Sequence, residues 1–253
     1  MKKLFVLIAA ACMTCTAAFA QTVKPFKEGE RAVFLGNSIT DGGHYHSYIW
    51  LYYMTRFPDM PIRVFNGGIG GDTAYDMNKR LDGDIFAMKP SVLMVTFGMN
   101  DSGYFEYNGD KPKEFGEQKY QESIKNYQQM EKRFKDLPDT RIVMVGTSPY
   151  DETVQLKENT PFKTKNETIK RLVEYQQESA AKNNWEFTDL NAPMTAINQQ
   201  YQQKDPTFTL CGSDRIHPDN DGHMVMAYLF LKAQGFVGKE VADMEINSCH
   251  RSI

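Results

Sequence analysis

The residues in this chain that could do chemistry begin with a serine at the end of an apolar run. Ser38 lies in the polar segment 36–40, directly after the apolar residues 33–35. Much later in the chain, Asp214 and His217 stand three residues apart. A serine hydroxyl becomes a nucleophile when a histidine accepts its proton and a carboxylate orients that histidine. Together these residues predict nucleophilic hydrolysis, although the aspartate and histidine alone are more typical of a capped turn and a surface histidine.

Two further segments carry groups that could stabilise the oxyanion formed during acyl transfer. The glycine-rich segment 67–71 exposes backbone N–H groups and lets the chain approach a ligand closely. Asn100 adds a side-chain amide that can donate in the same way. Taken singly, the glycines are equally typical of a tight strand-to-helix turn, and Asn100 of a turn residue bonded to its own backbone.

The elements that must position these residues follow from the alternation of apolar runs. Five short β-rich runs interleave with longer helical ones, which predicts a parallel sheet covered by helices on both faces. Residues 92–95 and 142–145 are apolar throughout, as expected of strands buried on both faces. We expect strands at 31–35, 62–66, 91–97, 141–147 and 185–190, and helices at 45–57, 74–88, 115–137, 166–183, 192–203 and 222–234.

The candidate residues should meet at one edge of this sheet. Ser38, the glycine-rich segment and Asn100 each follow a predicted strand, and His217 precedes the last predicted helix. Two loops of more than average length, 101–114 and 148–162, fall at the same strand ends. Ligands of open α/β sheets bind beyond the carboxyl ends of the strands. The sequence therefore predicts a single site at that edge.

Four short motifs occur in a fixed order: Gly-Asn-Ser-Ile-Thr at 36–40, Gly-Gly-Asp-Thr at 70–73, Gly-Met-Asn-Asp at 98–101 and Asp-Arg-Ile-His at 214–217. In this combination the chain resembles the SGNH hydrolase family, also called GDSL-type esterases and lipases. The resemblance runs from about residue 31 to about residue 235. It implies an α/β fold, a flavodoxin-like three-layer α/β/α sandwich around a five-stranded parallel sheet.

The resemblance also implies a role for each motif residue. Ser38 would be the nucleophile and would donate its backbone N–H to the oxyanion. His217 would be the general base, oriented by Asp214. Gly71 would supply a second backbone donor, and Asn100 a side-chain donor, to the oxyanion hole.

The first motif departs from the family's usual Gly-Asp-Ser, because Asn37 replaces the aspartate with an uncharged residue of the same shape. We expect activity to survive, since the triad carboxylate comes from Asp214. The open question is how the turn is held without the usual carboxylate. The same segment argues against the Gly-x-Ser-x-Gly elbow of α/β-hydrolases, because position 40 is a threonine.

Other side chains near the motifs are candidates for substrate contact. Tyr104 belongs to an aromatic cluster with Phe105 and Tyr107 that could face a sugar or an acyl group, although self-packing of the loop explains the cluster equally well. His44 and His46 follow the serine segment, and we expect a surface or rim position for both. Two histidines at this spacing without carboxylate partners make a poor metal site, so no metal or cofactor is expected.

The first twenty residues have the pattern of a secretory signal peptide. A positive start precedes an apolar run at 4–13, too short to span a membrane, and a small-residue cleavage motif at 18–20. A lipoprotein is disfavoured, because neither Cys12 nor Cys15 follows a leucine-led recognition box. We therefore expect a signal peptide at 1–20 and one hydrolase domain at 21–253, exported to the periplasm or the cell exterior.

Composition narrows the range of partners. The chain holds 29 basic and 32 acidic side chains without basic runs, which argues against nucleic acid and anionic membranes as partners. Cys211 and Cys249 would remain after signal cleavage, and the sequence is compatible with either a disulfide or two free thiols. The pattern shows no clear stop at residue 253, so it is also compatible with a longer natural protein.

The sequence thus predicts an exported, metal-independent carboxylic-ester hydrolase that works through an acyl-enzyme. A small acyl group on a polar carrier is the expected substrate, with acetylated glycans the leading class, on the basis of the resemblance and the predicted export. A lysophospholipase or lipase of the same family would need an apolar groove in loops 101–114 and 148–162, whose polarity weakens that alternative. A catalytically silent carbohydrate-binding protein on the same fold is a second alternative. A phosphate- or nucleotide-binding protein is a third alternative. It is disfavoured because the glycine segment 67–71 lacks the lysine expected of a phosphate-binding loop.

Overall fold

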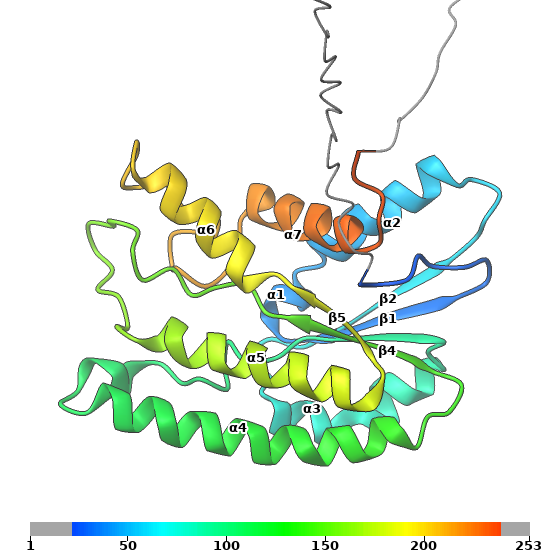
Figure 1. Ribbon diagram of the computed structural model, residues 1–253, viewed down its shortest axis with the longest axis horizontal. Coiled ribbons are helices and arrows are strands. Elements are labelled where there is room, and N and C mark those ends of the chain that lie inside the picture. Colours follow the sequence, from blue (N-terminus) through cyan, green and yellow to red (C-terminus); the bar gives the residue numbers. More distant parts are fainter. Residues whose placement is uncertain (1–21, 239–253) are drawn as a thin grey trace, which may run out of the picture.

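A parallel sheet of five strands forms the centre of the molecule (Figure 1). The computed structural model describes residues 22–238. The strand order is β2-β1-β3-β4-β5, and every neighbouring pair is parallel, which confirms the predicted sheet. The strands are β1 (Arg31–Gly36), β2 (Arg63–Gly68), β3 (Val92–Val95), β4 (Arg141–Gly146) and β5 (Glu186–Asp189).

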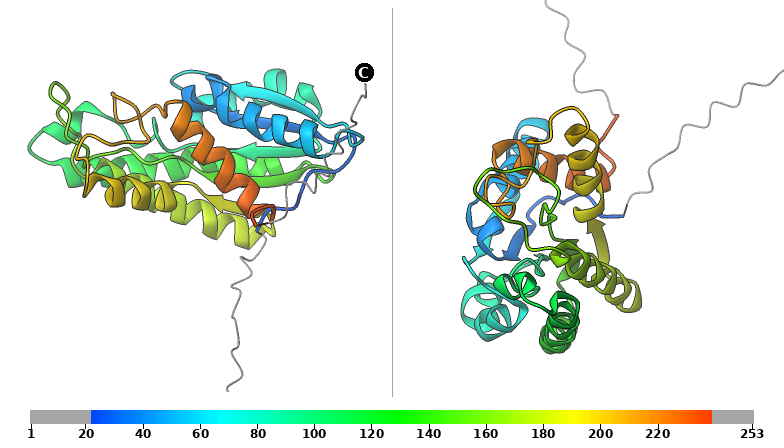
Figure 2. Two further views of the ribbon diagram at one scale, coloured as in Figure 1. Left: turned by 90° about the horizontal axis from the view of Figure 1, so that it is seen from above. Right: turned by 90° about the vertical axis from the view of Figure 1, so that its left-hand side faces the viewer.

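Helices cover both faces of the sheet and complete a three-layer sandwich (Figures 1 and 2). Helices α2, α6 and α7 lie on one face, and α3, α4 and α5 lie on the other. The very short α1 follows β1. The helices are α1 (Ser38–Asp41), α2 (His44–Arg56), α3 (Ala74–Arg80), α4 (Pro112–Lys135), α5 (Lys165–Asn183), α6 (Asn191–Gln202) and α7 (Asn220–Ala233).

Each face of the central strands packs into its own apolar core. In β3, Val92 and Met94 point into the core beneath α2 and α7, whereas Leu93 and Val95 point into the core beneath α3 and α4. All four side chains are buried. The uninterrupted apolar runs of β3 and β4 therefore lie between two layers of helix, as predicted.

The structure differs from the sequence-based elements in three places. The predicted helix at 74–88 is three pieces: α3, a π-helical turn at Leu81–Ile85 that includes Gly83, and a 3₁₀ turn at Phe86–Met88. The 3₁₀ turn at Phe105–Asn108 and helix α1 were not predicted. Both are only four residues long, too short for helical periodicity to be visible in a sequence.

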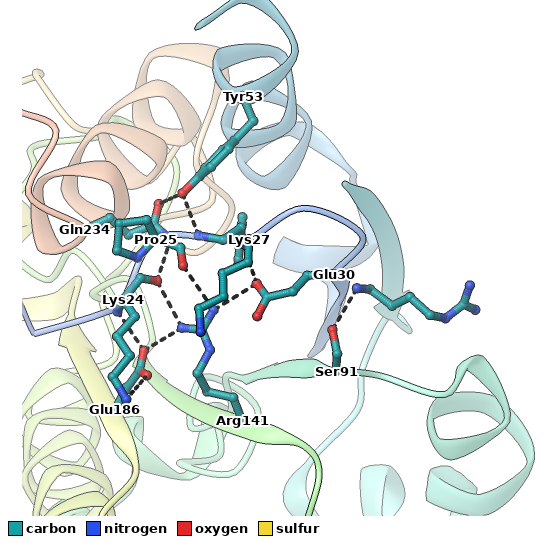
Figure 3. Close-up of polar contacts among 11 residues, drawn as sticks. Lys24, Pro25, Lys27, Glu30, Tyr53, Ser91, Arg141, Glu186 and Gln234 are labelled. Carbon is teal, nitrogen blue, oxygen red and sulfur yellow. Dashed lines mark hydrogen bonds and ion pairs between the residues drawn. The ribbon is translucent and has the colours of Figure 1, made fainter. Parts of the chain in front are cut away.

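The amino edge of the sheet is closed by polar contacts (Figure 3). The guanidinium of Arg141, at the start of β4, pairs with Glu30 at 3.1 Å and with Glu186 at 2.9 Å. Nearby, the Tyr53 hydroxyl donates to Gln234 at 2.9 Å and fixes α2 to the end of α7. The opposite, carboxyl edge of the sheet is the one that holds the candidate site.

Two sequence-based expectations fall on residues outside 22–238. The predicted signal peptide and Cys249, the possible partner of Cys211, are both in this group. Cys211 itself is buried, and its thiol donates to the carbonyl oxygen of Pro149 at 3.2 Å. Among the helices of the described residues, none combines the length and apolarity that crossing a membrane requires.

Candidate active site

Ser38 is the first residue of α1, immediately beyond the carboxyl end of β1. Asn37 caps this helix, because its side-chain oxygen accepts the backbone N–H of Ile39 at 3.1 Å. The cap needs only an acceptor oxygen, which an amide provides as a carboxylate would. The replacement of the family's usual aspartate by Asn37 therefore leaves the turn held.

Two glycines allow α1 to lie directly on the strand ends. A Cβ on Gly68, the last residue of β2, would lie 2.2 Å from the backbone nitrogen of Asp41. A Cβ on Gly36 would lie 2.1 Å from the hydroxyl oxygen of Thr40. Both distances are far shorter than van der Waals contact, so only glycine permits this approach. The side-chain amide of Asn66 adds a bond to the carbonyl of Asp41 at 2.9 Å.

The structure brings Ser38, His217 and Asp214 into one chain of hydrogen bonds. The Ser38 hydroxyl lies 2.7 Å from Nε2 of His217, and Nδ1 of His217 lies 2.5 Å from Oδ2 of Asp214. The second carboxylate oxygen of Asp214 accepts the backbone N–H groups of Ile216 and His217, each at 2.9 Å. We assign the proton of the neutral imidazole to Nδ1, because a carboxylate can only accept it. This leaves Nε2 as an acceptor for the serine proton.

Local electrostatics favour a strong base and an ionised carboxylate. The hydrogen bond to Asp214 raises the pKa of His217 above its usual value, although partial burial acts in the opposite direction. Burial acts to raise the pKa of Asp214, but the hydrogen bonds from the His217 side chain and from two backbone N–H groups outweigh it and lower that pKa. Both side chains are 48% exposed, so the triad opens to solvent.

Arg215 holds the triad segment in place, a role that sequence reasoning missed. Its side chain is buried, and its guanidinium donates to the carbonyl oxygens of Asp151 at 3.0 Å, Val154 at 2.8 Å and Asn159 at 2.6 Å. Its backbone has a φ of 69°, in the left-handed region that is uncommon for a side chain of this size. The arginine thereby joins the segment between the aspartate and histidine to loop 148–162.

Asn100 is oriented for donation by two hydrogen bonds. Its Nδ2 donates to the carbonyl oxygen of Asp72 at 2.9 Å, and its Oδ1 accepts the Tyr104 hydroxyl at 2.5 Å. This arrangement fixes which end of the amide is nitrogen and leaves one N–H without a partner among residues 22–238. Gly71 precedes Asp72, has a φ of 84° and is exposed. Asp72 therefore links the two predicted oxyanion donors, because it follows Gly71 in the chain and its carbonyl oxygen accepts the Asn100 amide.

A second arginine, only partly buried, braces this glycine turn. Arg80, in α3, forms an ion pair of 2.6 Å with the carboxylate of Asp72. Its guanidinium also donates to the carbonyl oxygens of Gly67 at 2.8 Å and Gly36 at 3.3 Å. The arginine therefore ties the ends of β1 and β2 to the turn that carries Gly71. Sequence reasoning missed it, since nothing local distinguishes it from other helical arginines.

Lys165, fully buried at the start of α5, is the third residue that was missed. Its Nζ donates to the carbonyl oxygens of Met99 at 2.7 Å and Gly103 at 2.5 Å, and to the Ser102 hydroxyl at 2.6 Å. It also lies 3.9 Å from the centre of the Tyr104 ring. Burial lowers the pKa of Lys165 to about 7. The lysine holds the turn that presents Asn100.

The predicted contact residues have different positions. Tyr104 reaches the site through its bond to Asn100. His44 is exposed at the rim, where its ring stacks on His223 at 5.0 Å. The prediction of a surface or rim position is wrong for His46, which is buried against Phe34 with Nε2 bonded to a backbone carbonyl. Two residues apart on a helix means nearly opposite faces, so only one of these histidines can face solvent.

Within residues 22–238, the structure holds no cluster of three or more histidine, cysteine, aspartate or glutamate side chains suited to a metal ion. What the site does hold is a serine hydrogen-bonded to an oriented histidine, and at the same sheet edge the Asn100 amide, which can donate to a developing negative charge. These groups are sufficient for acyl transfer. A three-layer α/β sandwich with this arrangement at its carboxyl edge has the architecture and the groups of a serine hydrolase.

Comparison with known proteins establishes the family. The model of the GDSL-like Lipase/Acylhydrolase family matches residues 34–225. The chain therefore belongs to this family of carboxylic-ester hydrolases, as its motifs predicted.

Two relatives carry further information. An acetylxylan esterase from Geobacillus stearothermophilus is 27% identical over 224 residues, which cover 82% of this chain and 95% of that protein. The solved structure of the acetylxylan esterase Axe2 from the same organism is 24% identical with a TM-score of 0.65, covering 87% of this chain and 99% of that one. Variants of Axe2 with a serine, an aspartate and a histidine replaced by alanine are described as catalytic mutants.

A third relative is much more similar in sequence. The solved structure of a gut microbial diltiazem-metabolizing enzyme is 85% identical, with a TM-score of 0.88. The match covers 89% of this chain but 51% of that one. The present chain therefore spans about half the length of that protein.

Proposed function

We propose that this chain hydrolyses acetyl esters by nucleophilic catalysis at Ser38. The observation that carries the proposal is the unbroken run of hydrogen bonds from the Ser38 hydroxyl through His217 to Asp214. Axe2, which has the same fold, supports it, because its catalytic mutants replace the same three residue types.

The geometry supports the following sequence of steps. His217 accepts the Ser38 proton at Nε2 as the serine oxygen attacks the ester carbonyl, and the Asp214 carboxylate stabilises the imidazolium. The oxyanion of the tetrahedral intermediate accepts the N–H groups of Ser38 and Gly71 and the free N–H of Asn100. The imidazolium then returns the proton to the leaving alcohol. Water, activated by the same histidine, hydrolyses the acetyl-enzyme and restores the serine.

Acetylated carbohydrate is the proposed substrate class. Two observations support it: the relatives named as acetylxylan esterases and the open triad, whose His217 and Asp214 side chains are each 48% exposed. An open site allows a bulky carrier to bring its acetyl group to the serine.

The nucleophile is tested by Ser38→Ala, assayed on nitrophenyl acetate, longer acyl esters and acetylated xylo-oligosaccharides. We expect a loss of at least about 10³-fold in kcat, since only the oxyanion donors and substrate binding would remain. Ser47→Ala is the matched control, because within residues 22–238 its hydroxyl bonds only the Gly43 carbonyl, at the start of its own helix. Equal rates for Ser38→Ala and the unsubstituted protein would end the assignment.

We also propose that the protein is exported and that cleavage follows Ala20, on the strength of the charged start and apolar run of the first twenty residues. An intact-mass measurement on the native protein checks this. A mass that includes residues 1–20 would contradict it.

A further inference from the structure

Three aromatic side chains from the two long loops form a continuous apolar surface, which we call the aromatic shelf: Tyr104, Phe105 and Phe162. The Phe162 ring lies between the other two, with centroids 5.9 Å from Tyr104 and 5.6 Å from Phe105. Phe105 is 79% exposed, more than any other large apolar side chain in residues 22–238. An aromatic ring left this exposed at one end of a packed cluster keeps most of its apolar area available for a ligand.

Two rings of the shelf pack on side chains beneath them. The Lys165 ammonium lies 3.9 Å below the Tyr104 ring centre. The Tyr150 ring stacks on Phe162 at 5.7 Å, and its hydroxyl accepts the Phe162 backbone N–H at 2.9 Å. Two of the three rings are thus held from beneath, so a ligand would not have to order them on binding.

The shelf is also joined to the reacting groups. The Tyr104 hydroxyl donates to Asn100, the proposed side-chain oxyanion donor, at 2.5 Å. The Asp214 carboxylate is near enough to help raise the pKa of the Tyr104 phenol, after burial as the main cause. The shelf therefore begins within the site.

Chemistry assigns the shelf to one side of the scissile bond. His217 protonates the departing oxygen, so the leaving alcohol must lie beside that imidazole. Loop 148–162, which ends at Phe162, bonds the His217 segment through the Arg215 guanidinium and through Asn159, whose amide donates to the Ser213 carbonyl at 3.3 Å. This connection to the His217 segment favours a position for the shelf on the side of the alcohol.

We propose that Tyr104, Phe105 and Phe162 form the subsite for the alcohol part of the ester, and that it takes a carrier with a flat apolar ring face. An aromatic ring and the apolar face of a sugar ring share this chemistry. The inference rests on the proposed esterase function and deepens it. Phe105 should contribute most of the new contact area, because its ring is the one that remains exposed.

The test compares Phe105→Ala with a matched control, Trp50→Ala, which removes another exposed aromatic ring from α2. Ethyl acetate has no ring, phenyl acetate has an aromatic one, and acetylated xylobiose has sugar rings. We expect Phe105→Ala to lower the ratio of kcat/KM for a ring-bearing ester to that for ethyl acetate about tenfold, chiefly through KM. Trp50→Ala should leave this ratio unchanged. A larger fall for phenyl acetate would identify an aromatic carrier, and a larger fall for acetylated xylobiose would identify a sugar carrier.

Three results would overturn the subsite: an unchanged ratio in Phe105→Ala, the same change in Trp50→Ala, or a loss confined to esters with long acyl chains. Failure of the esterase function itself has a different signature, which is a folded protein that hydrolyses none of these esters. Calorimetric titration of Ser38→Ala with phenyl acetate and xylobiose monoacetate, with and without Phe105→Ala, tests the shelf in that case. Equal affinity with and without the Phe105 ring would overturn it there too.

Discussion

Asp214 acts on His217 with both of its carboxylate oxygens. One oxygen binds the imidazole Nδ1 at 2.5 Å, while the other accepts the backbone N–H of Ile216 and of His217 itself. The carboxylate is therefore fixed to the backbone of the residue that it orients. This explains how a triad segment whose side chains are half exposed can still be held in one geometry.

Replacing this carboxylate should change both the rate and its dependence on pH. In Asp214→Asn an amide N–H can face Nδ1 and favour the wrong imidazole tautomer, so we expect kcat to fall on the order of 10⁴-fold. The base works only when neutral, and Asp214 raises the pKa of His217. Removing the carboxylate should therefore move the acidic limb of kcat/KM to lower pH. Profiles of the unsubstituted protein, Asp214→Asn and the control Asp219→Asn measure this, and an unmoved limb would argue against His217 as the base.

At the scale of elements, the site depends on how closely α1 approaches β2. Helix α1 has four residues and cannot be stable on its own. Its position is set by the Asn37 cap and by the absence of a side chain at Gly68, where a Cβ would meet the Asp41 nitrogen at 2.2 Å. The Ser38 hydroxyl is thus placed by contact between two backbones.

Gly68→Ala should displace this helix and with it the Ser38 hydroxyl. The atom that the new methyl would meet is backbone and cannot rotate away, and misplacement of a reacting group by about 1 Å can cost about 100-fold in rate. We therefore expect kcat to fall by about that factor. Gly83→Ala, where a Cβ has no atom within 4 Å, is the matched control. Similar kcat values for the two variants would show that the close approach does not position Ser38.

At the scale of the whole molecule, a buried histidine links stability to pH. His223, in α7, packs between the His44 and Tyr45 rings of α2 and the core, and its Nδ1 has no partner among the described residues. Burial, and then the nearby His44, His46 and His217, lower the pKa of His223 to about 4. In the unfolded chain the same imidazole takes up a proton near its usual pKa of about 6.5.

Unfolding should therefore take up a proton at His223 between about pH 6.5 and pH 4. The neutral, buried form contributes stability above this window, and that contribution is lost as the pH falls through it. His223→Phe keeps a ring against His44 but cannot titrate, so its Tm should fall less between pH 7.5 and pH 5 than that of the unsubstituted protein. Thermal unfolding at both pH values measures the difference. Parallel falls in Tm would show that the charge on His223 does not matter.

Much of this molecule could be predicted from sequence, for reasons that differ between its parts. The five strands could be predicted from short local runs. One of them, Val92–Val95, is apolar throughout, and an uninterrupted apolar run indicates a strand that is buried on both faces. That Ser38, Asp214 and His217 belong to one site could be predicted because their motifs occur in a recognisable order, and the structure does bring them together. The four-residue α1 and the break in the helix after α3 were missed, since neither leaves a periodic pattern.

The sequence by itself determined the sheet, the edge at which the site lies, and the residue types that could act there, because these depend on local periodicity and short motifs. Only the tertiary structure decided how those residues are held. Arg215, Arg80 and Lys165 are basic side chains whose buried or partly buried contacts reach backbone carbonyls from other parts of the chain, and no local pattern distinguishes them. Which carbonyls they reach depends on how the loops return to the sheet edge, a long-range property that is settled only when the whole chain packs.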